Sequence, residues 1–481
     1  MDQGPRENEF RDQRIANMKK LEELGYKPFA GAFERSGRLS EIIAGFQEGK
    51  AVRVAGRMVA KREMGKSVFA HLQDGSARFQ IYLKKDVVGD AAFAAFAHLD
   101  LGDHLGADGE LFITKTGEKT LKVHQWTLLS KALLPLPEKW HGLQDVELRY
   151  RHRYLDLVAN QDVRELFNKR TEAIREIRQF LTERGFCEVE TPMLQAMAGG
   201  AAANPFKTHY KALGQDMFLR IAPELYLKRL LVGGFDKVFE LNRNFRNEGL
   251  DRSHNPEFTM LEIYEAYADL RNMMKLVQDL IPHVAQKVFG SLKTGSGDNA
   301  VDLTPPWRTA TYRELILEKA GADWFTLSTA QAREKAQSFG LTIAPEWSHL
   351  EITHEIYEKM VEKSLVNPTF VTRFPADLIP LAKRCEDDAS AVDVFELVIR
   401  GWEIAPAYSE LNDPLEQRRR FEAQARGHAQ KVDEDFLAAL EHGMPPAGGM
   451  GIGIDRLIMV LTGADSIRDV VLFPQLKSKD S

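Results

Sequence analysis

Cysteine is scarce in this chain of 481 residues, and the two that occur, Cys187 and Cys385, lie far apart. Neither belongs to a metal-ligand spacing, so we expect no zinc, and two distant thiols indicate a reducing compartment more than a disulfide framework. The chain also lacks any run of about 18 apolar residues that could span a membrane. Its first ten residues are polar and charged, unlike a signal peptide. We therefore expect a cytoplasmic protein without a membrane partner.

A positive net charge is also missing. Lysine and arginine total 64 against 70 acidic residues, which gives a formal charge of −6. Overall basicity therefore does not argue for a nucleic-acid partner, although a local basic patch still can. There is no internal repeat or low-complexity tract, and the length allows two or three domains.

Short alternating segments between residues 52 and 128 predict a small all-β barrel. Glycine-containing turns separate most of them, and residues 90–99 read as a helix between strands. Five strands with one helix fit an oligonucleotide-binding barrel, although any small β-barrel would give the same pattern. The predicted strands cover residues 52–54, 67–72, 79–83, 110–113 and 121–128.

The barrel segment carries its own positive charge. Between residues 50 and 85, nine lysines and arginines, Arg62 among them, face only Glu63 and Asp74. A basic β module in an acidic protein indicates contact with a phosphate backbone, the alternative being an ordinary solvated barrel face. Phe69 is a candidate for base stacking and Gln80 for hydrogen bonding to a base edge.

In the C-terminal part, a predicted strand at residues 258–264 follows a strand at residues 238–241 and a polar loop at residues 242–255. Alternate side chains of a strand share a face, so Phe258, Met260, Glu262 and Tyr264 should project together. A carboxylate at the centre of such a face is costly to bury without a cation. The alternative is a glutamate on a solvated face.

A second segment, residues 395–412, contains Glu396, Glu403 and Glu410, with Tyr408 just before the last. Mg²⁺ takes hard oxygen ligands and usually bridges one or two carboxylates to phosphate oxygens. The three glutamates are therefore candidates for a metal–phosphate site, although glutamates are also common on protein surfaces.

A third segment, residues 448–459, is a glycine-rich turn from a strand into a helix. Glycines allow close approach of the backbone to a ligand, and Asp455 is placed to cap the helix. Arg456 falls in the first turn, where the helix dipole disfavours a cation unless an anion compensates. A generic glycine-rich turn is the alternative.

Together these segments resemble the class II aminoacyl-tRNA synthetases, and in particular their bacterial lysine-specific branch. Residues 245–248 and 254–258 are similar to motif 2, residues 451–456 to motif 3 and residues 185–192 to motif 1. Residues 199–202, 220–230 and 409–413 are similar to the lysine-specific members. The resemblance runs from about residue 52 to 474.

The resemblance implies an α+β fold, with a five-stranded OB-fold barrel followed by a class II catalytic domain on an antiparallel sheet flanked by helices. We expect a helical appendage at residues 1–48, an anticodon-binding barrel at 49–132, a linker at 133–160 and the catalytic domain at 161–481. The implied activity is ATP-dependent activation of L-lysine and its transfer to the 3′ end of tRNA. The implied assembly is a homodimer formed through motif 1.

The resemblance also implies roles for individual residues. Arg246 would neutralise the α-phosphate and the lysine carboxylate, with Arg456 as the second catalytic cation. Glu396 and Glu403 would hold Mg²⁺, and Arg62, Phe69 and Gln80 would contact the anticodon. The lysine-binding residues implied are Gly200, Glu224, Glu262, Tyr264, Tyr408 and Glu410. The ATP-binding residues implied are Arg246, Glu248, His254, Asn255, Phe258, Glu403, Ile404, Gly453, Asp455 and Arg456.

The sequence departs from the family pattern in a few places. Pro406 stands where an asparagine usually helps to hold the lysine carboxylate, and Asn204 and Ser253 replace usual arginines. A paralogue that lysylates an elongation factor would lack the barrel. An inactive tRNA-binding paralogue would be expected to lose charged residues that are present here. Aspartate and asparagine enzymes of the same architecture would need cations in place of Glu262 and Glu410.

Overall fold

The computed structural model describes residues 5–136, 143–201, 203–297, 300–379, 382–427 and 432–477. The chain divides into two compact units, Met1–Gln144 and Asp145–Ser481, and the division falls inside the segment predicted as a linker. Within the described ranges, no helix combines the length and the apolar character needed to cross a bilayer.

The first unit is a closed five-stranded barrel in the order β1-β2-β3-β5-β4, as the sequence predicts. Every second side chain of β2 is buried, so one face of the strand fills the barrel and the other faces out. Two short helices, α3 (Lys85–Val88) and α4 (Asp90–Phe96), connect β3 to β4. The strands are β1 (Ala51–Met64), β2 (Ser67–Gln73), β3 (Arg78–Lys84), β4 (His104–Ile113) and β5 (Lys119–Ser130).

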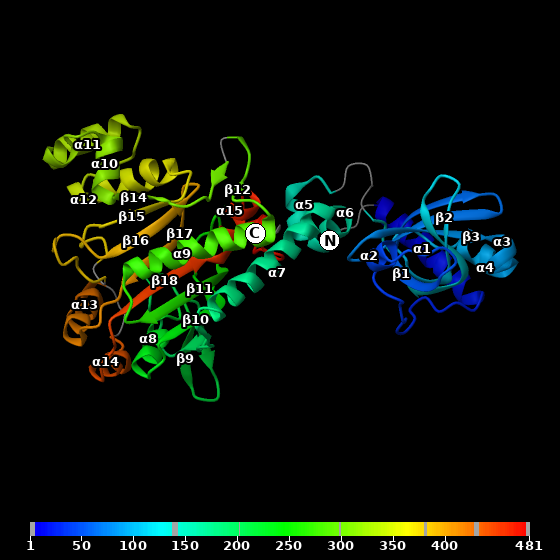
Figure 1. The fold of residues 1–481 in the computed structure, drawn as a ribbon, viewed down its shortest axis with the longest axis horizontal. Helices are drawn as coiled ribbons and strands as arrows, with labels where there is room; N and C mark the ends of the chain where they lie inside the picture. The colour runs from blue at the N-terminus through cyan, green and yellow to red at the C-terminus, as the bar shows by residue number, and fades with distance from the viewer. Residues whose placement is uncertain are drawn as a thin grey trace. The chain divides into compact units, whose positions relative to one another are not determined.

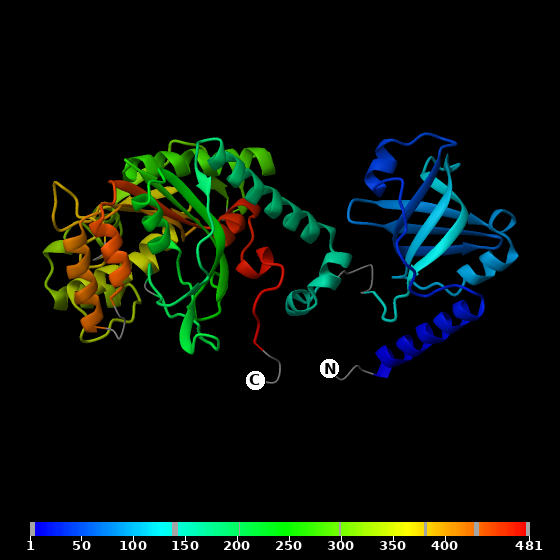
Figure 2. The ribbon, with the colours of Figure 1, turned by 90° about the horizontal axis from the view of Figure 1, so that it is seen from below.

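The segment before the barrel is part of the same unit. It contains α1 (Pro5–Glu23) and α2 (Leu39–Ala44), and Figure 2 shows α1 lying beside the strands. Leu21, Leu39 and Ile42 join the apolar core of the barrel. The predicted helical appendage is therefore packed onto the barrel.

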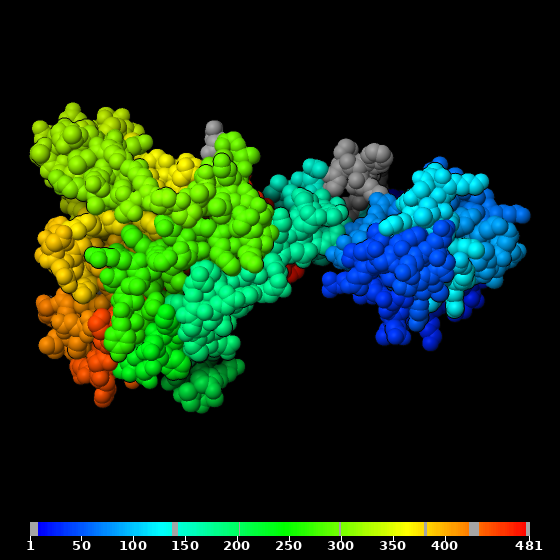
Figure 3. Space-filling model, in the orientation of Figure 1, coloured from blue at the N-terminus to red at the C-terminus, as the bar shows by residue number. Residues whose placement is uncertain are grey.

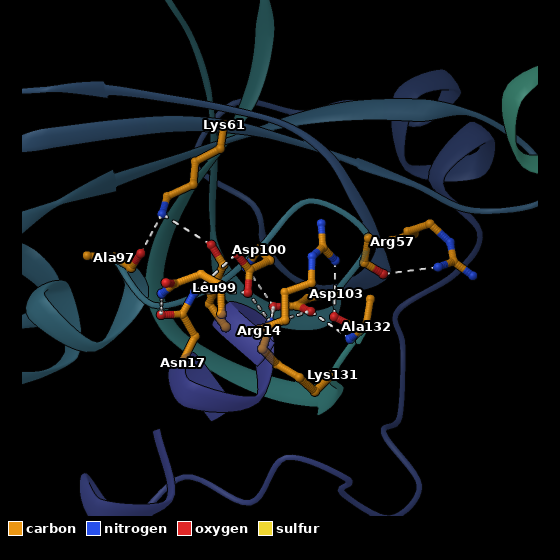
Figure 4. Close-up of polar contacts among 12 residues, drawn as sticks. Arg14, Asn17, Arg57, Lys61, Ala97, Leu99, Asp100, Asp103, Lys131 and Ala132 are labelled. Atoms are coloured by element: carbon orange, nitrogen blue, oxygen red, sulfur yellow. Dashed lines mark hydrogen bonds and ion pairs between the residues drawn. The ribbon is translucent and has the colours of Figure 1, made fainter. Parts of the chain in front are cut away.

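A buried ion network ties α1 to the end of β5. Lys131, whose side chain is fully buried, lies 2.5 Å from Asp100 and 3.0 Å from Asp103. Asn17 donates to Asp100, and Arg14 donates to the carbonyl of Ala132 at 3.0 Å (Figure 4). A buried ammonium is tolerated only when it is paired, so the two aspartates fix the position of Lys131. The hydrogen bonds of Asn17 and Arg14 attach α1 to the same network.

In the described residues, the second unit is built on an eight-stranded sheet in the order β14-β15-β16-β17-β18-β11-β10-β6 (Figure 1). Neighbours are antiparallel except for the pair at each edge, β14 with β15 and β10 with β6. The strands are β6 (Cys187–Glu188), β10 (Lys237–Phe245), β11 (Glu257–Ala266), β14 (Arg308–Thr311), β15 (Thr369–Thr372), β16 (Val394–Ile399), β17 (Trp402–Ser409) and β18 (Ala447–Gly453). Two smaller sheets contain β7 (Leu194–Gln195), β8 (Lys207–Tyr210) and β9 (Gln215–Leu219), and β12 (Lys293–Thr294) and β13 (Val301–Asp302).

One face of the large sheet is covered by α7 (Gln161–Thr182), α9 (Leu270–Val284) and α15 (Ile454–Thr462), which share an apolar core with Leu261 and Ile263 of β11. On the other face, α8 (Glu224–Val232) packs against Val238 and Tyr264. This unit also contains the helices α5 (Val146–Arg151), α6 (Arg153–Ala159), α13 (Pro414–Gly427), α14 (Glu434–Glu441) and α16 (Ile467–Val470).

A lobe between β14 and β15 has its own apolar core, centred on Trp324, Tyr312 and Tyr357. It stands out at one end of the second unit in Figure 3. Its elements are α10 (Tyr312–Ala320), α11 (Thr329–Ser338), α12 (His349–Ile356) and η4 (Tyr357–Val361), a π-helical turn that continues α12.

Candidate active site

The face of the large sheet that carries α8 also holds a cavity of about 420 Å³. Phe258, Met260, Glu262 and Tyr264 of β11 all line it, while Leu261 and Ile263 point into the core on the other side. The alternation predicted for this strand is confirmed. The polar loop predicted from residue 242 begins later, because β10 continues to Phe245 and pairs with β11 along its whole length.

Most of the residues assigned from the sequence surround this one cavity, although they come from distant parts of the chain. The lining residues among them are Gly200, Glu224, Arg246, Glu248, His254, Asn255, Phe258, Glu262, Tyr264, Glu403, Ile404, Tyr408, Gly453, Asp455 and Arg456. Glu396 and Glu410 are not among the residues that line it. Pro406, the departure from the family pattern, does line it.

One end of the cavity is acidic. Glu262 is buried, and the hydroxyl of Tyr264 donates to it at 3.3 Å. Burial raises the pKa of Glu262 to about 8, the neighbouring Glu224 adds to the rise, and Arg246 opposes it. A carboxylate kept from ionising by burial and repulsion favours a cationic ligand, which would restore its charge.

A buried lysine, which the sequence reading did not single out, lies behind this acidic end. The Nζ atom of Lys228 on α8 is 2.6 Å from Glu224 and 2.6 Å from Glu410. Burial lowers the pKa of Lys228, but the two carboxylates outweigh that effect and hold the pKa above its ordinary value. From sequence, Glu224 and Lys228 form an i,i+4 pair of the kind usually found on helix surfaces. Only the fold shows that the pair is buried.

Two glycines make room for these carboxylates. Gly200 has a φ of +84°, and a Cβ there would lie 3.1 Å from the Cβ of Glu224. A Cβ on Gly449 of β18 would collide with the carboxylate of Glu410 and the ring of Tyr264. Both glutamates therefore depend on a glycine opposite them.

Arg246 lies beside the acidic end with donor capacity to spare. Its guanidinium is 5.1 Å from the centre of the Phe258 ring, a cation–π contact. Its Nε is buried without a hydrogen-bond partner in the described residues. A buried donor of this kind is costly unless a ligand satisfies it, which fits an anion at this point of the cavity.

Arg456 is held by a chain of hydrogen bonds that starts at Asp251. Arg456 donates to the carbonyl of Glu403 at 2.9 Å and contacts Nε2 of His254 at 3.0 Å. A guanidinium can only donate, so Nε2 accepts and the proton sits on Nδ1, 2.7 Å from Asp251. Burial raises the pKa of Asp251, but hydrogen bonds from Ser253 and His254 outweigh it and lower the pKa to about 2.

The capping role expected for Asp455 is wrong. The residue at the start of α15 is Gly453, which has no side chain to cap with, and Asp455 lies within the first turn. Its carboxylate instead accepts from the backbone N–H of Thr259 at 2.8 Å and pairs with Arg170 of α7 at 2.7 Å. Asp455 thus joins β11, α7 and α15 beneath the cavity.

The carboxylates expected to hold Mg²⁺ come together on β16 and β17. Glu396 accepts a hydrogen bond from the hydroxyl of Tyr357 at 3.1 Å. Removal from water and repulsion by Glu403 and Glu362 hold the pKa of Glu396 well above its usual range. Glu410, which the sequence places in the same segment, instead lies with Lys228.

The described ranges contain no cluster of three or more side chains able to hold a metal by themselves. Two converging carboxylates that repel each other still fit a cation that completes its shell with phosphate oxygens and water, as Mg²⁺ does. The donor set therefore suits a Mg²⁺ shared with a nucleotide.

On the barrel, Arg62 is exposed and pairs with Phe69 across β1 and β2. The Phe69 ring lies 4.7 Å from the ring of Tyr82. Gln80 is buried, donates to Glu118 at 2.6 Å and accepts from the hydroxyl of Thr120 at 2.8 Å. Glu118, which the sequence reading did not identify, thus orients the amide of Gln80.

The comparisons with known proteins agree with this arrangement. Residues 145–477 match the family described as class II tRNA synthetases (D, K and N), and residues 52–129 match the OB-fold nucleic acid binding domain. The chain belongs to the class II tRNA synthetases. It is 49% identical to the lysine–tRNA ligase of Carboxydothermus hydrogenoformans, over 98% of this chain and 99% of the relative. It is 50% identical to the lysine–tRNA ligases of Syntrophomonas wolfei and Moorella thermoacetica, over 98% of this chain and 98% and 99% of the relatives.

For a class II tRNA synthetase, the cavity joins the two kinds of group that the reaction requires. Arg246 and Arg456 provide positive charge at one part of the wall, and Glu224 and Glu262 provide negative charge at another. The first pair suits phosphate and carboxylate groups, and the second suits ammonium groups.

Proposed function

We propose that this chain is a lysine–tRNA ligase, which converts L-lysine and ATP to lysyl-adenylate and transfers the lysyl group to the 3′ end of the tRNA for lysine. The observation that carries the proposal is the acidic end of the cavity, where Glu224, Glu262 and Tyr264 converge. Lysine brings two ammonium groups. An aspartate or asparagine substrate would place a carboxylate or a neutral amide against these glutamates, and the nearest lysine, Lys228, is already paired twice.

The reaction joins two anions, so its first requirement is positive charge. Arg246, with its unsatisfied buried nitrogen, neutralises the lysine carboxylate and the α-phosphate together. A carboxylate oxygen of lysine attacks the α-phosphorus, the bond to the bridging oxygen breaks and pyrophosphate leaves. The terminal ribose hydroxyl of tRNA then attacks the lysyl carbonyl and AMP leaves. Neither step needs an enzymic nucleophile, so catalysis consists of positioning and charge stabilisation.

The nucleotide would lie along the wall that contains Phe258 and Arg456. Phe258 offers a flat face for adenine, and the relay from Asp251 through His254 orients Arg456. Glu396 and Glu403 would hold Mg²⁺, and Tyr357 orients the carboxylate of Glu396. When bound, Mg²⁺ neutralises phosphate charge and orients the phosphate groups.

The barrel would read the anticodon. Phe69 and Tyr82 form an aromatic surface, with the exposed guanidinium of Arg62 on the neighbouring strand. Gln80 is buried and bonded to Glu118 and Thr120, so it would reach a base edge only through its second amide N–H. The barrel also distinguishes this chain from a paralogue that would lysylate a protein and lack such a module.

We propose a homodimer assembled through the motif 1 region, α7 and β6. The support is that β6 is a sheet edge with both of its residues exposed. Cys187 and Cys385 are free thiols, which is compatible with the cytoplasm. Light scattering of the purified chain tests the assembly, and a monomer at micromolar concentration would exclude it.

Amino-acid-dependent ATP–pyrophosphate exchange, measured across the twenty amino acids, tests the function. Lysine alone should support fast exchange. Glu262→Gln should raise the KM for lysine by roughly 100-fold or more while the KM for ATP changes little, because breaking a buried ion pair costs about 3–5 kcal/mol. Exchange that is equally fast with another amino acid, or lysine-dependent exchange unaltered in Glu262→Gln, would refute the assignment.

A further inference from the structure

The buried ammonium of Lys228 is the least expected charge near the cavity. It lies 2.6 Å from the carboxylates of both Glu224 and Glu410, and the residue is only 5% exposed. It belongs to α8, whose Leu227 and Leu231 fix the helix in an apolar core. The ammonium therefore has no route to water that keeps the helix in place.

Lys228 lies behind the cavity rather than inside it. Glu224 lines the cavity, whereas Lys228 and Glu410 do not. This position argues against the alternative that the Lys228 ammonium occupies the place of the substrate, as a plug of the cavity would, because such a group would lie in the cavity. It also shows that one of the two carboxylates bound to Lys228 is available to a ligand on its other side.

The charges at this end of the cavity have a simple balance. Glu224, Glu262 and Glu410 bring three carboxylates to this end of the cavity, and Lys228, paired with Glu224 and Glu410, brings one cation, which leaves two negative charges when all are ionised. A lysine substrate carries two ammonium groups and a carboxylate, and the carboxylate is matched by Arg246. With the substrate present, the acidic end is neutral when all three glutamates are ionised.

We propose that Lys228 is a positioning and specificity-determining residue for lysine: it is the permanent counter-charge between Glu224 and Glu410, and it directs Glu224 towards the substrate. This inference rests on the proposed function. Without Lys228, Glu224 and the buried Glu410 would hold an extra proton, since two carboxylates that share a site resist joint ionisation. Lysine would then have to displace that proton in order to bind.

The groups that face Glu410 support this account. Glu224 and Lys228 approach from α8, Tyr264 from β11, and Tyr408 from β17. On β18 the opposing residue is Gly449, which has no charge. Among these groups Lys228 is the one permanent cation. Burial and the neighbouring Glu224 raise the pKa of Glu410, and Lys228 is the group that opposes the rise.

The test compares Lys228→Met, Lys228→Gln and Lys228→Arg with the wild-type full-length chain by calorimetric titration with L-lysine. Titrations at pH 7 in two buffers of different ionisation enthalpy give the number of protons released on binding. Lys237→Met is the matched control, because Lys237 forms a more exposed ion pair with Glu265 on the same two strands, β10 and β11, and neither residue lines the cavity. ATP affinity and the melting temperature are measured for every variant.

We expect Lys228→Met and Lys228→Gln to weaken lysine binding by roughly 100-fold or more, with ATP binding retained. Each should release about one more proton than the wild type when lysine binds. Lys228→Arg should restore much of the affinity and the wild-type number of released protons, and Lys237→Met should resemble the wild type.

A Gln variant that binds lysine as the wild type does would show that only hydrogen bonding matters, and would overturn the proposal. Tighter lysine binding in the Met variant would identify Lys228 as a plug, with the same consequence. A number of released protons equal to that of the wild type in Lys228→Met and Lys228→Gln would also overturn the proposal. If the wild type itself fails to bind lysine, the proposed function fails. The wild-type titration therefore tests the proposed function, and the variant titrations test the role of Lys228.

Discussion

At the scale of single residues, the acidic end of the cavity couples lysine binding to protonation. The pKa of Glu262 is raised to about 8, first by burial and then by Glu224. Below that pH the empty cavity holds a proton on Glu262, and the proton must leave before the carboxylate can pair with an ammonium group.

The KM for lysine should therefore fall as the pH rises from 6 to 8, by up to about tenfold per unit, and level off above 8. The sign follows from the ionised form being both the binding form and the form favoured by higher pH. Lysine-dependent exchange at saturating ATP gives this profile, and the KM for ATP is the internal reference. In Glu262→Gln the slope due to this group should disappear. A KM for lysine that rises over the same pH range would contradict the assignment of Glu262.

Pro406 gives a second prediction at this scale. It lines the cavity on β17 and offers neither a side-chain donor nor a backbone N–H. If Arg246 holds the lysine carboxylate, Pro406→Asn should be tolerated, with lysine affinity equal or better. One added hydrogen bond to a charged group contributes about 1.5–3 kcal/mol at most, and the lost rigidity offsets part of it.

Arg246→Ala should abolish lysyl-adenylate formation, measured by exchange in the same assay. An active Arg246→Ala together with an inactive Pro406→Asn would show that the carboxylate is held through the β17 segment instead.

The residues missed from the sequence share one physical feature: each acts through another side chain. Lys228 looks like a surface i,i+4 partner, and Glu118 looks like a polar turn residue, until the fold brings them to Glu410 and Gln80. Residues that touch a ligand recur in recognisable motifs, whereas supporting residues are defined only by their neighbours in space.

At the scale of secondary-structure elements, the clearest periodic pattern in the sequence predicted the orientation of side chains correctly. The period of two in residues 258–264 predicted which side chains of β11 face the cavity. Local signals at element ends were less reliable. β10 continues into a polar stretch because β11 pairs with it, and Asp455 bonds to β11 and α7 instead of capping α15. Long-range hydrogen bonds decided both cases.

The π-helical turn η4 gives a prediction at this scale, because it places Tyr357 against Glu396 of β16. Tyr357→Phe removes the hydrogen bond that orients this carboxylate. The Mg²⁺ concentration for half-maximal exchange should rise by about 10- to 100-fold, the usual effect of losing a group that orients a metal ligand.

Tyr312→Phe is the matched control for that variant. Its ring lies 4.9 Å from that of Tyr357, and its hydroxyl has no hydrogen-bond partner in the described residues. We expect an unchanged Mg²⁺ requirement in Tyr312→Phe. Equal effects of the two substitutions would mean that the lobe acts through packing and not through the Tyr357 hydroxyl.

At the scale of the whole molecule, two units have separate cores, and the proposed tasks are divided between them. The barrel and its N-terminal helices share one apolar core, and the large sheet has its own. The residues assigned to lysine and ATP all belong to Asp145–Ser481, and those assigned to the anticodon all belong to Met1–Gln144. The sequence indicates two parts of this kind, because short alternating segments and a local excess of basic residues mark the barrel region.

The two half-reactions should therefore separate when the barrel is altered. In Phe69→Ala, lysine-dependent exchange should stay at the wild-type rate, while the kcat/KM for charging tRNA should fall by roughly 5- to 150-fold, since stacking of one base contributes about 1–3 kcal/mol. A truncated chain of residues 145–481 should show the same split in a stronger form, provided that its melting profile shows a folded unit. Exchange depends on groups that this part of the chain contains, whereas discrimination among tRNAs depends on the missing barrel. If the truncated chain charged tRNA as well as the full chain, or if Phe69→Ala slowed both half-reactions equally, anticodon reading could not be assigned to the barrel.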